Sequence, residues 1–125
     1  RRARDMVMAA DAKNPEAFVA HLADAVEIHG ASGQVRRAKR DEIRNSGFWG
    51  LLRQFNVRVA AWDFSRNDVK EIDPNTVEIG FLAKGEVDGK PFPFYVRTTF
   101  ARQPDGQFKL TAFRAYEAID RTKPV

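Results

Sequence analysis

Four side chains in this sequence combine a reactive or binding group with a suggestive position: His29, Arg114, Tyr116 and Trp49. His29 stands before Gly30 at the end of a predicted strand. An imidazole there could act as a base near neutral pH or donate to a ligand. The alternative is a polar histidine that bonds to the nearby backbone, since well-placed histidines are enriched at functional sites but not confined to them.

Arg114 and Tyr116 fall on the predicted apolar face of the last strand. Strict alternation gives that face Phe108, Leu110, Ala112, Arg114 and Tyr116. If it lines a cavity, the guanidinium could bind a ligand carboxylate in bidentate fashion, and the tyrosine could donate to the same ligand. The alternative is an arginine near the sheet edge, paired with Glu117, Asp120 or Asp24, beside a tyrosine satisfied by the backbone.

Trp49 is a further candidate ligand contact. It follows Phe48 in a predicted helix, and Trp62 and Phe64 lie in the next predicted strand. Aromatic side chains at such positions are more typical of core and rim packing than of a cofactor site.

The first half of the chain predicts helices. One helix spans residues 1–13, and a second begins at Asn14-Pro15-Glu16, a typical cap, first-turn proline and first-turn acid. We expect this second helix to end at Asp24 and a short strand to cover residues 25–29. A third helix is predicted from about Lys39 to Phe55, with a break near Gly47.

The second half predicts an antiparallel sheet. The expected strands are Val57 to Phe64, Thr76 to Val87, Phe92 to Arg102, and Phe108 to about Asp120. Asp88-Gly89 is typical of a hairpin turn with two positive φ angles, and residues 103–106 predict a second turn. Tyr95, Arg97 and Thr99 should occupy the convex face, which would suit a dimer interface. Helices ahead of an antiparallel sheet indicate one α+β domain over residues 1–125.

Composition excludes several classes of function. The sequence has no cysteine, which rules out disulfides and thiolate chemistry and fits a reducing or an oxidising compartment alike. No metal signature, phosphate-binding glycine loop or nucleophile elbow occurs, so we expect neither metal nor cofactor. No apolar run reaches the roughly 18 residues of a membrane span. Because the chain begins at Arg1, we expect a processed protein, a domain of a longer one, or a trimmed chain.

The net charge of +4 comes partly from a basic cluster at Arg36, Arg37, Lys39 and Arg40. Such clusters can bind phosphate backbones, with an affinity that falls steeply with salt. Acidic residues follow this cluster at once, however, and no aromatic side chains interleave with it. We therefore interpret it as a solvated loop that enters a helix, which makes nucleic-acid binding the least favoured function.

The order of these elements resembles the nuclear-transport-factor-2-like (SnoaL-like) proteins. The resemblance rests on residues 16–30, on Lys39-Arg40-Asp41-Glu42-Ile43-Arg44, and on Asp105-Gly106-Gln107-Phe108-Lys109-Leu110 near the end. It implies a curved sheet wrapped around helices, with a cone-shaped pocket open at one end and a homodimer formed through the sheet. The family hosts isomerases, dehydratases, hydrolases and cyclases as well as members that only bind or assemble, so function must be argued from the site.

The ketosteroid isomerases of that family use a carboxylate base, with a tyrosine and a protonated aspartic acid as donors. The base position falls at or near His29, and the first predicted helix has no tyrosine, so the isomerase site is not reproduced. We therefore expect a homodimeric binding or assembly domain for a small apolar or carboxylate ligand. The alternative is a small lyase, isomerase or hydrolase with His29 as base and Arg114 or Tyr116 as the stabilising donor.

Overall fold

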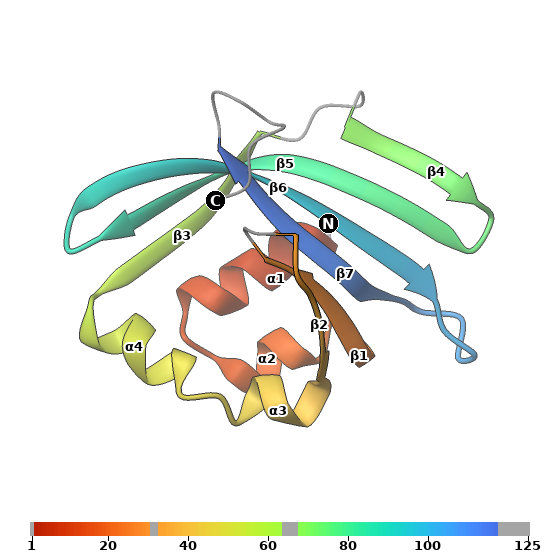
Figure 1. Cartoon of the computed structure of the whole chain (residues 1–125), viewed down its shortest axis with the longest axis horizontal. Helices are drawn as coiled ribbons and strands as arrows, with labels where there is room; N and C mark the ends of the chain where they lie inside the picture. Colours follow the sequence, from red (N-terminus) through yellow and green to blue (C-terminus); the bar gives the residue numbers. More distant parts are fainter. Residues whose placement is uncertain (1, 31–32, 64–67, 118–125) are drawn as a thin grey trace.

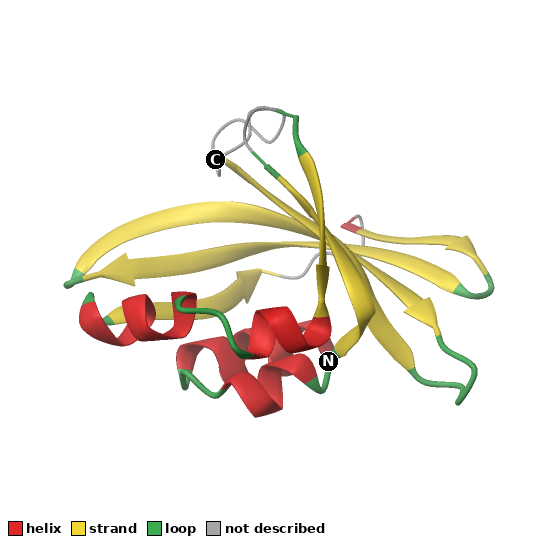
Figure 2. Ribbon diagram, turned by 60° about the horizontal axis from the view of Figure 1, so that its bottom comes forward, coloured by secondary structure: helices red, strands yellow, loops and turns green. Residues whose placement is uncertain are grey.

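The protein consists of a curved antiparallel sheet with its helices gathered on one face (Figures 1 and 2). The computed structural model describes residues 2–30, 33–63 and 68–117, of which residues 61–63 are described by their backbone alone. The predicted α+β class is confirmed, with helices packed into the concave side of the sheet. Among the described residues, no helix has the length and apolar character that crossing a membrane requires.

The helices largely follow the predicted order. They are α1 (Arg2–Asp11), α2 (Pro15–Val19), α3 (Arg40–Arg44) and α4 (Phe48–Gln54). The Asn14 cap is confirmed, since its Oδ1 accepts a hydrogen bond from the Ala17 backbone N–H at 3.1 Å. The predicted third helix is indeed broken before Phe48, and Trp49 Nε1 donates across the break to the Ile43 carbonyl at 2.9 Å.

The seven strands form one sheet with the order β2-β1-β7-β6-β5-β3, and β4 pairs with the other end of β5 (Figure 1). Their bounds are β1 Leu22–His29, β2 Val35–Lys39, β3 Val57–Asp63, β4 Val69–Asp73, β5 Thr76–Val87, β6 Lys90–Arg102 and β7 Phe108–Glu117. Only the β1–β7 pair is parallel. Phe64 and residues 118–120, predicted as strand ends, lie outside the described residues.

Two hairpins are confirmed by their turn geometry. Asp88 and Gly89 between β5 and β6 have φ angles of 51° and 84°, as a type I′ turn requires. In the β6–β7 turn Gly106 has a φ of 86°, and its N–H donates to the Gln103 carbonyl at 2.8 Å. These turns set the register of the long central strands.

The predictions around β1 and β2 were wrong in two respects. The second helix ends at Val19 rather than Asp24, because Leu22 and Ala23 already belong to β1. Residues 35–39, interpreted as a solvated loop, form the edge strand β2, which pairs antiparallel with β1. Only Ala38 of β2 is buried, so this strand lacks the half-apolar alternation by which strands are recognised. The short strand β4 was also missed, and all five of its residues are exposed.

The core lies between α1 and the concave face of the sheet. Its least exposed members are Ala3, Leu22, Val26, Phe81 and Ala83, each 1% exposed, and Leu110, 2% exposed. Because these side chains are almost completely enclosed by their neighbours, this part of the cone is filled. Any open binding site must lie elsewhere on the fold.

Candidate functional site

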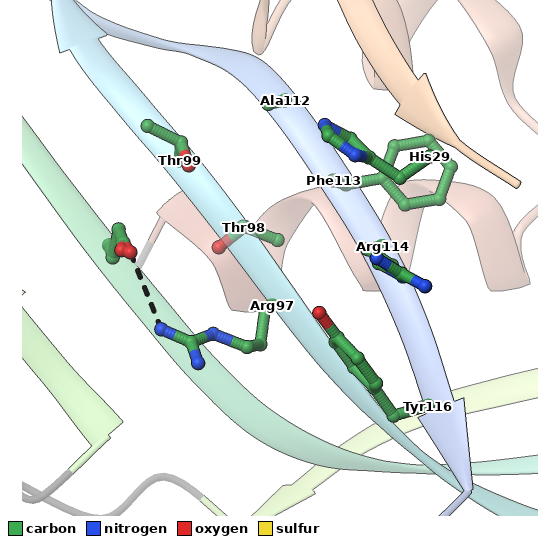
Figure 3. Close-up of a pocket in the computed structure, with 9 residues that line it drawn as sticks. His29, Arg97, Thr98, Thr99, Ala112, Phe113, Arg114 and Tyr116 are labelled. Carbon is green, nitrogen blue, oxygen red and sulfur yellow. Dashed lines mark hydrogen bonds and ion pairs between the residues drawn. The ribbon is translucent and has the colours of Figure 1, made fainter. Parts of the chain in front are cut away.

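The predicted site residues His29, Arg114 and Tyr116 come together in an open hollow of about 270 Å³ on the outer face of the sheet (Figure 3). Strands β1, β5, β6 and β7 supply its walls, and the helices lie behind the sheet in this view. The complete lining is His29, Glu78, Arg97, Thr98, Thr99, Ala112, Phe113, Arg114 and Tyr116. Three of the four predicted site residues therefore meet, but not inside the cone.

A β-bulge explains why Arg114 and Tyr116 face outward. Leu110 pairs with Phe100 of β6, whereas Ala112 pairs with Thr99, so Thr111 is an extra residue on β7. Each residue after Thr111 is thereby turned to the face opposite the one that strict alternation predicts. The prediction that Arg114 and Tyr116 share the face of Phe108 and Leu110 was therefore wrong; Phe113 packs against the core in their place.

The outer face is organised in rows that run across the strands. Glu78, Thr99, Ala112 and Glu27 are consecutive partners from β5 to β1 and form one row. The next row contains Gly80, Arg97 and Arg114, and the third contains Leu82, Tyr95 and Tyr116. The predicted placement of Tyr95, Arg97 and Thr99 opposite the core face is confirmed. The small side chain of Ala112 leaves room for the hollow between the larger ones.

His29 enters the hollow from the end of β1. The residue before it, Ile28, pairs with Phe113 and packs against the core, which directs His29 to the outer face beside Arg114. Its Nε2 lies 3.7 Å from Oε2 of Glu27, and its side chain is 32% exposed. The carboxylate can hold the imidazole in place, and the ring remains open to a ligand.

The two arginines of the hollow differ in their partners. Arg97 lies within 3.3 Å of Glu78 Oε1 through Nη2, an exposed ion pair drawn as the dashed line in Figure 3. The guanidinium carbon of Arg114 lies 5.1 Å from the centre of the Tyr116 ring, at cation–π distance. The Nε of Arg114 is buried and has no hydrogen-bond partner among the described residues. A buried donor without a partner is costly, and each one calls for an explanation.

Trp49 is not part of this hollow. Its side chain is buried, its Nε1 donates to the Ile43 carbonyl, and its ring meets Phe18 edge-to-face at 5.4 Å. These contacts fix α4 against α2 and agree with the core interpretation of the sequence. A ligand in the outer hollow would not reach it.

A second hollow, about 310 Å³ in volume, lies where the end of α1 meets β3, and sequence reasoning missed it. Asp11 Oδ1 accepts hydrogen bonds from Arg58 Nε at 2.8 Å and from the Val59 N–H at 2.9 Å, while Oδ2 accepts from Arg58 Nη2 at 3.0 Å. The bond from Arg58 is the main reason that the pKa of Asp11 lies below its usual value. Because 47 residues separate this pair, no local sequence pattern could indicate it.

The remaining charged groups support structure rather than a metal site. No group of three or more His, Asp or Glu side chains in the described part of the chain could hold a metal ion. His21 accepts a hydrogen bond at Nδ1 from Arg2 at 3.0 Å, and burial, followed by the charge of Arg2, lowers its pKa. Of the basic cluster, Arg40 lies 3.4 Å from Asp24, and Arg36 and Arg37 project from the exposed edge strand β2.

No protein-family model and no curated protein matches this sequence. Solved structures of the same fold do match. A domain of unknown function with a cystatin-like fold from Nostoc punctiforme has a TM-score of 0.70 at 12% identity, covering 91% of this chain and 71% of that one. An NTF2-like protein from Novosphingobium aromaticivorans has a TM-score of 0.68 at 15% identity (94% and 80% covered). A ketosteroid isomerase-like protein from Erwinia carotovora atroseptica has a TM-score of 0.66 at 11% identity (91% and 88% covered).

Proposed function

Because this chain has the cystatin-like cone of the nuclear-transport-factor-2-like superfamily, we propose that it is a small-molecule-binding domain whose site is the outer hollow. The observation that carries the proposal is the meeting of Arg114, Tyr116 and His29, from two strands, around one open space. The part of the concave face that contacts α1 is filled by core side chains. Binding sites combine a concave surface with a few convergent polar groups, as this hollow does.

The same geometry favours binding over catalysis. A general base must lie within hydrogen-bond reach of the proton that it removes, in a site that excludes water. The hollow is open, so water reaches His29, whose side chain is 32% exposed. Such a site can hold a small molecule without the enclosure that most reactions need.

A hollow-filling substitution tests the location of the site. Ala112→Leu should occupy the hollow from its floor, while Ala60→Leu places the same bulk in the second hollow at β3. We expect a thermal-shift screen of small organic acids and neutral compounds to give ligands that stabilise the wild type and Ala60→Leu but not Ala112→Leu. Ligands that lose binding only in Ala60→Leu would assign the function to the second hollow instead.

Homodimerisation through the sheet is the second part of the proposal. The outer face presents two arginines and Tyr116, residue types that are enriched at interfaces. A partner on this face would lie over the hollow, so ligand binding and dimerisation should influence each other. Sedimentation analysis with and without a ligand from the screen should show a shift in the monomer–dimer equilibrium. A monomer at every concentration would remove this part of the proposal and leave the binding site intact.

Catalysis by His29 is the alternative, favoured by its pairing with Glu27 in the same hollow. A carboxylate beside an imidazole fixes the orientation of the ring. The test is to incubate each bound compound with the wild type and with His29→Gln and to analyse the products by mass spectrometry. Conversion that disappears in His29→Gln would establish the enzyme, and unchanged compounds with both proteins would support binding alone.

A further inference from the structure

Arg97 and Arg114 stand directly opposite each other on neighbouring strands, β6 and β7. Both side chains project from the outer face and line the hollow (Figure 3). Like charges at directly opposed positions of an antiparallel pair destabilise the sheet. Such an arrangement calls for a compensating negative charge close to both guanidinium groups.

The described part of the chain supplies that charge to only one of the two. Glu78 lies within 3.3 Å of Arg97, and the other nearby carboxylate, Glu27, lies beside His29 at 3.7 Å. Arg114 has no ion pair among the described residues, and its buried Nε has no hydrogen-bond partner there. One guanidinium in the hollow therefore keeps both a positive charge and an unused donor.

The stacking of Arg114 on Tyr116 sets how a ligand could approach. A guanidinium that lies over an aromatic ring has that face covered, and its N–H groups all point outward in its own plane. Because Nε is buried, a ligand in the hollow bonds to the two terminal nitrogens and must present two acceptor oxygens in their plane. A carboxylate has this planar two-oxygen geometry.

The local charges favour an anion with a single negative charge over one with two. Arg97 and Arg114 carry two positive charges, and Glu78 and Glu27 carry two negative ones on the adjacent row. A phosphate dianion would meet those two carboxylates at close range, whereas a monocarboxylate needs only the guanidinium that lacks a partner. The remaining walls include the Thr99 hydroxyl and the methyl group of Ala112, which suit an acid with a small apolar body.

We propose that the outer hollow binds a monocarboxylic acid, whose carboxylate accepts hydrogen bonds from the two terminal nitrogens of Arg114. This inference rests on the proposed binding function and assigns the chemical class of its ligand. The volume of about 270 Å³ lies just below the usual range for ligand sites, about 300 to 1,000 Å³, and fits a small organic acid.

The test is an NMR titration of the whole chain that follows the Nε–H resonance of Arg114 and the backbone amide of Ala112. Benzoate is the probe, benzamide is its neutral isostere, and inorganic phosphate is the competing anion. At concentrations up to about 20 mM, which exceed a millimolar Kd, benzoate should shift both resonances with saturation. Benzamide and phosphate should bind at least about tenfold more weakly.

Substitutions of Arg114 test whether this residue binds the benzoate. Arg114→Gln should abolish the benzoate shifts, and Arg114→Lys should weaken them at least about tenfold, because lysine keeps the charge but not the planar fork. Arg102→Gln is the matched control, since Arg102 also stacks 5.1 Å from an aromatic ring centre, that of Phe108, but does not line the hollow. The melting temperature of Arg114→Gln should stay within about 4 °C of the wild type, because the cation–π contact with Tyr116 is the one internal contact known to be lost among the described residues.

The outcomes separate the two proposals. Equal binding of benzamide and benzoate in the hollow would overturn the carboxylate assignment and leave the binding function intact, and so would a preference for phosphate. The absence of any benzoate shift at Arg114 would overturn the assignment as well. If no compound of a wider screen shifted Ala112 either, the proposed function would also be wrong.

Discussion

Gly80 offers a demanding test of the packing on the outer face. It lies on β5 opposite Arg97, where a Cβ would overlap the hydroxyl of Tyr95 and lie 2.6 Å from its Cζ. Tyr95 is only 5% exposed, and its hydroxyl donates to Asp68 Oδ1 at 2.8 Å. The Gly80→Ala substitution therefore requires the tyrosine ring to move and its hydrogen bond to break.

The magnitude follows from three contributions. Overpacking a tight site costs about 1 to 3 kcal/mol. Loss of the Tyr95 hydrogen bond adds about 1 kcal/mol. Alanine also restricts the conformations of the unfolded chain, which stabilises the folded protein by about 0.4 to 1 kcal/mol. The net loss in the free energy of unfolding is about 1 to 3.6 kcal/mol, which for a domain of this size lowers the melting temperature by about 4 to 14 °C.

Thermal and urea unfolding of Gly80→Ala measure this loss, with Gly50→Ala as the control. Nothing lies within 4 Å of a Cβ at Gly50, which is in helix α4, so that change should stabilise the protein by up to about 1 kcal/mol. In a double-mutant cycle, Gly80→Ala should cost much less when Tyr95 is already Val, because the ring is then absent. A melting temperature of Gly80→Ala at or above that of the wild type would refute the close contact.

Three further predictions concern the fold and its dependence on pH. Asp11→Ala should lower the free energy of unfolding, measured in urea, by about 1 to 2 kcal/mol, because the Val59 N–H loses its acceptor. Arg58→Lys changes an exposed side chain and should lower this free energy clearly less. Equal losses in the two variants would contradict this reasoning. The pKa of His21 is lowered in the folded protein, so the neutral side chain contributes its full stabilisation above the unfolded pKa, and this stabilisation is lost as the pH falls through the folded pKa. The melting temperature should therefore drop more between about pH 8 and about pH 5.5 in the wild type than in His21→Gln. Parallel pH profiles of the two proteins would argue against this role of His21. Deletion of Thr111 should abolish cooperative unfolding in a calorimeter, because it removes the bulge and turns Arg114 toward the core. The control Thr111→Val keeps the residue count and should keep the cooperative transition. A deletion variant with the melting temperature of the wild type would show that the strand tolerates a shift.

The sequence predicted the elements that depend on the backbone preferences of a few neighbouring residues. Asp88 and Gly89 indicated a turn because few residue pairs accept two positive φ angles, and the structure has both. The Asn14 cap and the bounds of β5 were predicted for similar local reasons. The order of helices and strands followed, and with it the α+β class and the cone-shaped fold.

Strand β2 shows where local patterns fail. Four of its five residues are exposed, and three of these are basic, so the segment has the composition of a solvated loop. It is a strand because β1 offers a free edge to pair with, and that edge exists only in the folded sheet. The strand propensity of a segment depends on such partners as much as on its own residues.

The candidate site was predicted in its residues but not in its location. His29, Arg114 and Tyr116 were identified by their chemistry, whereas the face on which they meet depended on Thr111, one extra residue opposite Thr99 of β6. Alternation has a period of two, so a single inserted residue reverses every side chain after it. The sequence alone thus determined which groups are available for binding. Only the pairing of β7 with β6 decided that they lie outside the cone.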